Sequence, residues 1–226
     1  MTLNDQVLPE LKRIRAELAK LRACTIHVGI QGNADSEILT IARVHEYGAT
    51  IHAKNAKNLC IPIHKESYDK SPRDFPDLFF IRSSGGYLLG VEEDKTKRRK
   101  KSSAHDDYGV DDKQLKLLFL LLPSVTIPER SFIRAGFDAN RDRLAAECQR
   151  VVGEIIRNGM TAETAVEQIG IFAVEAIQQF MNNPGNFKPK GKIQKERAPN
   201  LANSPLTVTK RMINSITFNP VWGDRT

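Results

Sequence analysis

The chain has 226 residues, of which 40% are hydrophobic and 27% are charged, a composition that supports a packed core and argues against a disordered chain. No apolar run approaches the ~20 residues that span a bilayer, and the charged N-terminus lacks the apolar segment of a signal peptide, so we expect no membrane partner. The net charge of +7 favours a polyanionic neighbour such as nucleic acid.

The first quarter of the chain predicts a helix, a strand and a second helix. Leucines at helical spacing indicate an amphipathic helix over residues 3–22. Residues 24–30 alternate apolar with polar side chains, which is typical of a half-buried strand. Asp35 or Ser36 can cap the next helix, which Gly48 ends.

The middle of the chain predicts antiparallel strands. After strand and loop at 49–64 and a polar loop at 65–77, residues 78–91 form a hairpin whose turn contains Gly85 and Gly86. The apolar run at 115–122 is its partner strand. Between them, residues 92–114 contain almost no apolar side chains, and we expect an inserted charged loop.

The last third predicts two long helices and a final strand. One helix runs from Phe132 to Asn158, and Thr161 caps the second. Residues 184–205 predict an extended arm, and a strand follows at 215–221. Because helices and strands come in runs, the fold class is α+β, an antiparallel sheet packed against two long helices in one domain over residues 1–226.

The stretch PSVTIPERSFIRAGFDAN, residues 123–140, joins a strand to a helix. Pro128 fixes its own φ and forces the preceding residue into extended geometry, which ends the strand. Ser131 can cap the helix, and Arg134 can pair with Asp138 four residues later. A rigid strand-to-helix corner therefore explains the stretch without a catalytic loop.

Three segments, VHEYGATI (44–51), TIPERSFIRAGFDAN (126–140) and SPLTVTKRMINSITFNPV (204–221), resemble in this order the phage tail-completion or neck proteins, including the Mu-type virion morphogenesis proteins. That family has a helix ending in His-Glu-Phe/Tyr-Gly, an Ile-Pro-x-Arg-x-Phe turn, and a Leu-x-x-Thr-x-x-Leu-x-x-Ser-Ile stretch before a last strand. The chain departs from it at Ser131, where proline is usual, and at 92–114 and 183–203. The matching residues are His45, Glu46, Tyr47, Gly48, Pro128, Arg130, Phe132, Leu206, Thr209, Met212, Ser215 and Ile216.

The resemblance implies a structural virion protein without enzymatic activity, assembled in the host cytoplasm. Such a protein forms a homo-oligomeric ring, hexameric in this family, where the head connector meets the tail tube. Its partners are other neck, connector and tail-tube proteins. Thr209 would begin a short helix that holds Met212 inward, and Ser215 would lead into the last strand. Tail terminator, tail-completion and collar roles stay open.

The sequence contains no pattern that favours catalysis, a metal or a cofactor. His45 and Glu46 begin an HExxH pattern, but position 49 is alanine, so the second histidine is missing. Cys24, Cys60 and Cys148 are too far apart for a zinc knuckle, and we expect three reduced thiols used mainly in packing.

A basic run, KTKRRKK at 95–101, supplies most of the surplus charge. It is either a solvated loop tip or a contact for phosphates or for an acidic segment of a neighbouring subunit. No aromatic residue interleaves the run, which argues against base stacking. The alternative function for the whole chain is non-specific DNA binding through this loop. Its basic residues are Lys95, Lys97, Arg98, Arg99, Lys100 and Lys101.

Overall fold

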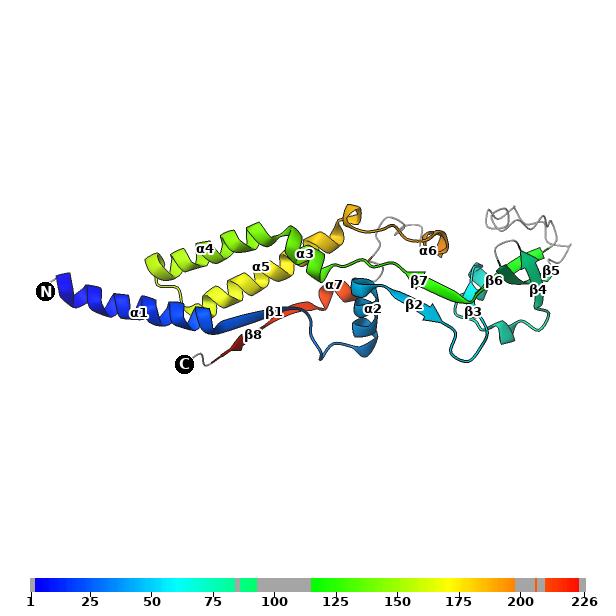
Figure 1. Cartoon of the computed structure of the whole chain (residues 1–226), viewed down its shortest axis with the longest axis horizontal. Coiled ribbons are helices and arrows are strands. Elements are labelled where there is room, and N and C mark those ends of the chain that lie inside the picture. Colours follow the sequence, from blue (N-terminus) through cyan, green and yellow to red (C-terminus); the bar gives the residue numbers. More distant parts are fainter. Residues whose placement is uncertain (1–2, 84–85, 93–114, 198–205, 207–209, 224–226) are drawn as a thin grey trace. The chain divides into compact units, whose positions relative to one another are not determined.

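A computed structural model describes residues 3–83, 86–92, 115–197, 206 and 210–223 (Figure 1). The sequence predicts one domain, whereas the structure divides into two compact units. The first unit comprises Met1–Gly48, Pro128–Gly191 and Ala198–Thr226, and the second comprises Ala49–Ile127 and Lys192–Arg197. The basic run at 95–101 and Thr209 lie outside the described residues.

The first unit packs helices on a two-stranded antiparallel ribbon, in which β1 pairs with β8 so that Ile26 lies opposite Pro220. Helix α5 packs on both strands, and α4 packs on α5. The elements are α1 (Leu3–Ala23), β1 (Cys24–Ile30), α2 (Ser36–Tyr47), α3 (Ile133–Ala139), α4 (Arg141–Asn158), α5 (Ala162–Asn182), η4 (Pro184–Asn186), α7 (Arg211–Asn214) and β8 (Ile216–Trp222).

The second unit is a four-stranded antiparallel sheet in the order β3-β6-β5-β4, with a separate β2–β7 ribbon. Strand β6 is central and buried on both faces, as its apolar run predicts. The elements are β2 (Ala49–His52), β3 (Leu59–Pro62), η1 (Lys65–Ser67), η2 (Pro72–Asp74), β4 (Phe79–Ser83), β5 (Gly86–Glu92), β6 (Leu115–Leu122), β7 (Ser124–Ile127) and α6 (Lys192–Arg197).

The predicted α+β class is confirmed, with antiparallel sheets and two long helices. Local signals work as expected: the Asp35 side chain accepts from Glu37 N–H at 2.9 Å, and that of Thr161 accepts from Thr164 N–H at 3.2 Å. Gly48 ends α2 at φ 71°, a conformation that favours glycine. No helix among the described residues is long and apolar enough to cross a membrane.

The prediction of one continuous helix from Phe132 to Asn158 is wrong, because the helix is interrupted at Asn140, between α3 and α4. The Asn140 side-chain amide donates to Gly136 O at 2.8 Å, and the Asn140 backbone N–H donates to Phe137 O. Asparagine side chains compete in this way with the regular helical hydrogen bonds.

The described part of the predicted arm, residues 184–197, is not uniformly extended. It contains the 3-10 turn η4 and the short helix α6. Phe187 packs in the core of the first unit and forms an edge-to-face pair with Phe180, with ring centroids 5.5 Å apart. The arm therefore begins as part of the core.

Helix α5 lies close to β8 at Gly170, where an added Cβ would lie 2.3 Å from the Phe218 ring. We expect Gly170→Ala to destabilise the first unit by about 1–3 kcal/mol, because the ring and the strand must shift. The matched control is Gly153→Ala in α4, where the atoms nearest to an added Cβ belong to the movable guanidinium of Arg157. That variant is expected to gain up to about 1 kcal/mol from helix propensity. Urea unfolding of both variants tests the contrast, and equal stabilities would contradict it.

Candidate functional site

The first two motif segments meet at one corner of the first unit. The backbone N–H of Arg130 donates to His45 O, the carbonyl near the end of α2, at 2.7 Å. This bond joins residues 85 positions apart in sequence and brings the entry to α3 against the last turn of α2. The corner is thus built from both segments.

The carboxylate of Glu46 provides the N-terminal cap of α3. It accepts from the backbone N–H groups of Phe132, Ile133 and Arg134 at 2.8, 3.1 and 3.1 Å. These are donors that the first turn of a helix leaves without an internal partner. Phe132 occupies the N-cap position and offers no side-chain acceptor, so a residue from another helix does the capping.

Ser131 bridges this cap. Its hydroxyl donates to Glu46 Oε1 at 2.7 Å and accepts from Ala135 N–H at 3.3 Å. The prediction that Ser131 caps the helix from the N-cap position is wrong in position, because the helix begins one residue later. The hydroxyl still satisfies one N–H of the first turn.

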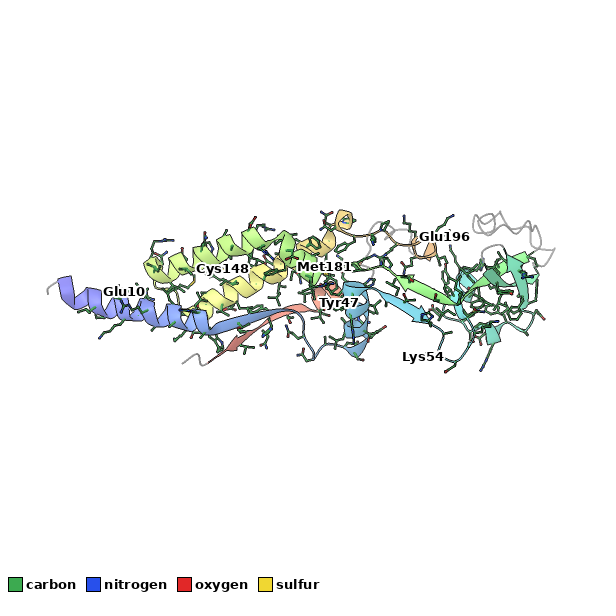
Figure 2. The ribbon with its side chains drawn as sticks, in the orientation of Figure 1. Glu10, Tyr47, Lys54, Cys148, Met181 and Glu196 are labelled. Carbon is green, nitrogen blue, oxygen red and sulfur yellow. The ribbon has the colours of Figure 1, made fainter. Side chains whose placement is uncertain are left out.

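Arg134 closes the exposed side of the corner. Its Nε donates to Glu46 Oε1 at 3.0 Å, and its Nη2 donates to Glu46 O at 2.8 Å and to Glu129 Oε1 at 2.9 Å. The guanidinium lies over the ring of Tyr47, 4.8 Å from the centroid; Tyr47 is labelled in Figure 2.

The predicted Arg134–Asp138 pair is wrong. Asp138 instead pairs with Arg141 at 3.1 Å. Side chains of a helix point toward its N-terminus, so Arg134 reaches back to the carboxylate at the helix start.

Hydrogen bonding keeps the Glu46 carboxylate ionised. Burial alone would raise the pKa of Glu46, but the hydrogen bonds from Ile133, Ser131, Phe132 and Arg134 together hold that pKa below its ordinary value. The ionised Glu46 carboxylate therefore lies at the N-terminus of α3, where the helix dipole also favours a negative charge.

A buried cation, Arg130, anchors the chain that follows η4. Arg130 is 5% exposed, and its Nε and Nη2 donate to Lys188 O at 2.8 Å and Pro189 O at 3.1 Å. Burial lowers the pKa of Arg130. Burial and the charge of Arg130 also lower the pKa of Lys190, which is itself buried.

His45 packs beside this cluster as a neutral side chain. Its Nδ1 is buried and has no hydrogen-bond partner among the described residues. Burial, and then the charge of Arg130, lower the pKa of His45 to about 4. A histidine in this setting is not a general base poised for neutral pH.

The third motif segment joins the same core. Phe132, Met212 and Ile216 are buried in one cluster, and Phe132 is fully buried. The Ser215 hydroxyl donates to Arg211 O at 2.7 Å at the end of α7. The expected short helix that holds Met212 inward is present as α7 and leads into β8 as predicted. It begins at Arg211, with Lys210 at its N-cap, and not at Thr209 as expected. The cluster also contains Ala42, Ile177, Met181, Phe187, Leu206 and Ile213.

The roles of Glu46 as the cap of α3 and of Arg130 as a donor to two carbonyls were not predicted from the sequence. One signal was available: an acidic residue in the last turn of α2 opposes that helix's dipole, so Glu46 needs a partner elsewhere. Nothing local indicates that Arg130 reaches the carbonyls of Lys188 and Pro189. Among the described residues, no group of three potential ligands could hold a metal ion.

No protein-family model, no curated protein and no solved structure matches this chain.

His45 makes the first unit sensitive to mild acid. Its folded pKa of about 4 lies below the ordinary value of 6.5, so the unfolded chain binds more protons between these values. Stability is complete above pH 6.5 and falls as the pH drops, by about 2 kcal/mol between pH 7 and pH 5. We expect His45→Phe to flatten this part of the profile. Urea titrations at both pH values measure it, and an unchanged slope would contradict the assignment.

Proposed function

We propose that this chain is a structural protein of a phage virion that forms a ring at the head–tail junction, as a tail-completion, terminator or neck protein. The resemblance of the three motifs motivates the proposal. The observation that carries it is their convergence: Glu46 of the first segment caps α3 at Phe132 of the second, and Phe132 packs in one buried cluster with Met212 and Ile216 of the third. Because residues of the three motifs contact one another around the start of α3, each motif depends on the other two, which is consistent with their joint occurrence in a family of structural proteins.

The geometry also favours a structural over an enzymatic role. The motif residues that could act as acids, bases or ion-binding groups are engaged in the fold: Glu46 caps α3, Arg130 donates to two carbonyls, and His45 is partly buried and neutral. An active site needs such groups open to a substrate. We therefore propose ring contacts with copies of this chain and with neck, connector and tail-tube proteins as its function, in the virion.

The test is the mass of the purified protein by light scattering across a concentration series, with particle images of any large species. A closed ring, six-fold in the related proteins, is the expected result. The protein is then mixed with purified tails that lack it. A chain that stays monomeric in solution and also fails to bind such tails would overturn the proposal.

The alternative is non-specific DNA binding, favoured by the six basic residues within 95–101. It requires the isolated protein to bind duplex DNA with an affinity that falls steeply as salt rises. Changing Lys97, Arg98, Arg99, Lys100 and Lys101 to glutamine would abolish that binding. Absence of binding at low salt would remove the alternative.

A further inference from the structure

The helical layer of the first unit is wider than the sheet beneath it. Two helices side by side span roughly 20 Å, whereas two strands span only about 10 Å. Helix α5 packs on both β1 and β8, but α4 packs on α5 and α1 and makes no comparable contact with either strand. The cavity that α4 lines takes residues from β1 and none from β8 among the described residues, so α4 lies on the β1 side of the ribbon and extends beyond its edge.

An apolar trough of about 330 Å³ occupies this position. One wall comes from Ile26 and Val28 of β1, and the other from Leu144 and Cys148 of α4. Cys148 is labelled in Figure 2. Its remaining lining comes from α3, from α5 and from two further residues of α4, and it is mostly apolar: Gly136, Phe137, Arg141, Ala145, Ile169, Ala173, Ala176 and Ile177. Helix α4 therefore has apolar side chains facing the space beyond the outer edge of β1, where no strand lies among the described residues.

The two outer edges of the β1–β8 ribbon differ. The hydrogen bond from Gly223 N–H to Ala23 O shows that these two residues form a hydrogen-bonded pair. Hydrogen-bonded and non-hydrogen-bonded pairs alternate along an antiparallel ribbon, so the odd-numbered residues of both strands bond across it. The backbone N–H and C=O groups of the even-numbered residues therefore point outward, away from the partner strand. On β8 the outward position 220 is proline, which has no N–H to offer. On β1, Ile26 and Val28 point their N–H and C=O groups outward, and no described residue pairs with them.

The second unit carries a matching edge. Three edge strands among the described residues are longer than four residues, namely β1, β4 and β8, and of these only β8 contains proline. Strand β4 contains Phe80, which is 74% exposed, the largest exposed fraction of any large hydrophobic side chain whose burial the structure describes. Unprotected edges pair with other strands, and exposed aromatic side chains are frequent anchors of interfaces.

We propose that the outer edge of β1 is an assembly site, at which strand β4 of a second copy of this chain pairs with β1 and places Phe80 in the trough beneath α4. Main-chain hydrogen bonds to Ile26 and Val28 supply affinity, and the apolar trough supplies specificity. The contact joins two different surfaces, so it is heterologous, and repetition closes a ring where the rotation permits. The inference rests on the proposed function for its expectation that copies associate.

The experiment follows backbone hydrogen exchange at Ile26 and Val28 and alkylation of Cys148 across a concentration series of the full chain. As copies associate, we expect both amides to exchange at least about tenfold more slowly and the Cys148 thiol to be shielded. Phe80→Ser should raise the concentration needed for association about 10- to 100-fold, the loss expected for one buried aromatic side chain. Trp222→Ser is the matched control, because it removes an exposed aromatic side chain from the proline-containing strand. It should change that concentration by less than about twofold, the scale of an isolated surface substitution.

Three results would overturn this contact. Protection of Ile26 and Val28 at every concentration would assign the trough to this chain's own segments. Concentration-dependent protection that Phe80→Ser leaves intact would indicate another pairing, such as β1 with β1 of the second copy. Association without protection would place the interface elsewhere. If rings form in the second or third of these cases, only the β1–β4 contact is wrong and the proposed function stands. A chain that stays monomeric and does not bind purified tails would contradict both the contact and the proposed function.

Discussion

Replacing Glu46 with alanine is expected to destabilise the first unit by about 3–5 kcal/mol, among the largest losses that one substitution can cause. The carboxylate accepts three backbone N–H groups of α3, the Ser131 hydroxyl and Arg134 Nε. Its removal leaves buried donors without acceptors and takes from Arg134 one of its two carboxylate partners among the described residues. Urea unfolding followed by the fluorescence of Trp222, the single tryptophan of the chain and part of β8, reports on this unit.

The matched control is Glu129→Ala. Glu129 pairs with the same Arg134, at 2.9 Å, but lies exposed at the surface. Exposed ion pairs contribute little, so this variant should lose less than about 1 kcal/mol. Equal losses for the two variants would mean that the charge of Arg134, and not the cap of α3, determines the effect.

The pH dependence of the Glu46 contribution has a defined sign. The folded pKa of Glu46 lies below the ordinary value of 4.5, so the unfolded chain takes up its proton first as the pH falls. The stabilisation is complete above pH 4.5 and is lost as the pH falls through the folded pKa. Loss of stability between pH 7 and pH 5 therefore reports on His45, and loss at lower pH reports on Glu46 as well.

Patterns with a local cause were predictable from the sequence. Alternation in residues 24–30 predicts β1, the apolar run at 115–122 predicts β6, and Gly48 and Thr161 mark helix ends by their own conformational preferences. Each of these signals depends on neighbours within a few positions. The strand and helix types were therefore accessible without knowledge of the tertiary contacts.

The site depends on contacts that such signals do not contain. Spacing along a helix offered Asp138 as the partner of Arg134, but the folded chain brings Glu46, 88 positions away, to the start of the same helix. A buried carboxylate that also caps the helix outcompetes an exposed pair, because it satisfies several otherwise unpaired donors at once. The break at Asn140 has a similar origin, since a single side-chain hydrogen bond overrides a continuous apolar stripe.

Replacing Arg130 with methionine is the second substitution with a large expected effect, a loss of about 2–4 kcal/mol. Methionine keeps most of the side-chain volume but cannot donate, so the carbonyls of Lys188 and Pro189 lose their donors while the packing is largely preserved. The chain after η4 should then detach locally, which hydrogen exchange at residues 186–191 would detect. Arg141→Met is the matched control, because Arg141 is exposed and pairs only with Asp138 among the described residues.

The same variant has a second effect that a loss of packing would not produce. The charge of Arg130 is one of the two causes that lower the pKa of His45, and burial is the larger. In Arg130→Met the His45 pKa should therefore rise above about 4 and stay below 6.5, and the loss of stability between pH 7 and pH 5 should become smaller. The His45 pKa can be measured by NMR titration in folded protein. A stability equal to the original chain, or an unmoved His45 pKa, would show that the Arg130 guanidinium does not hold this junction together.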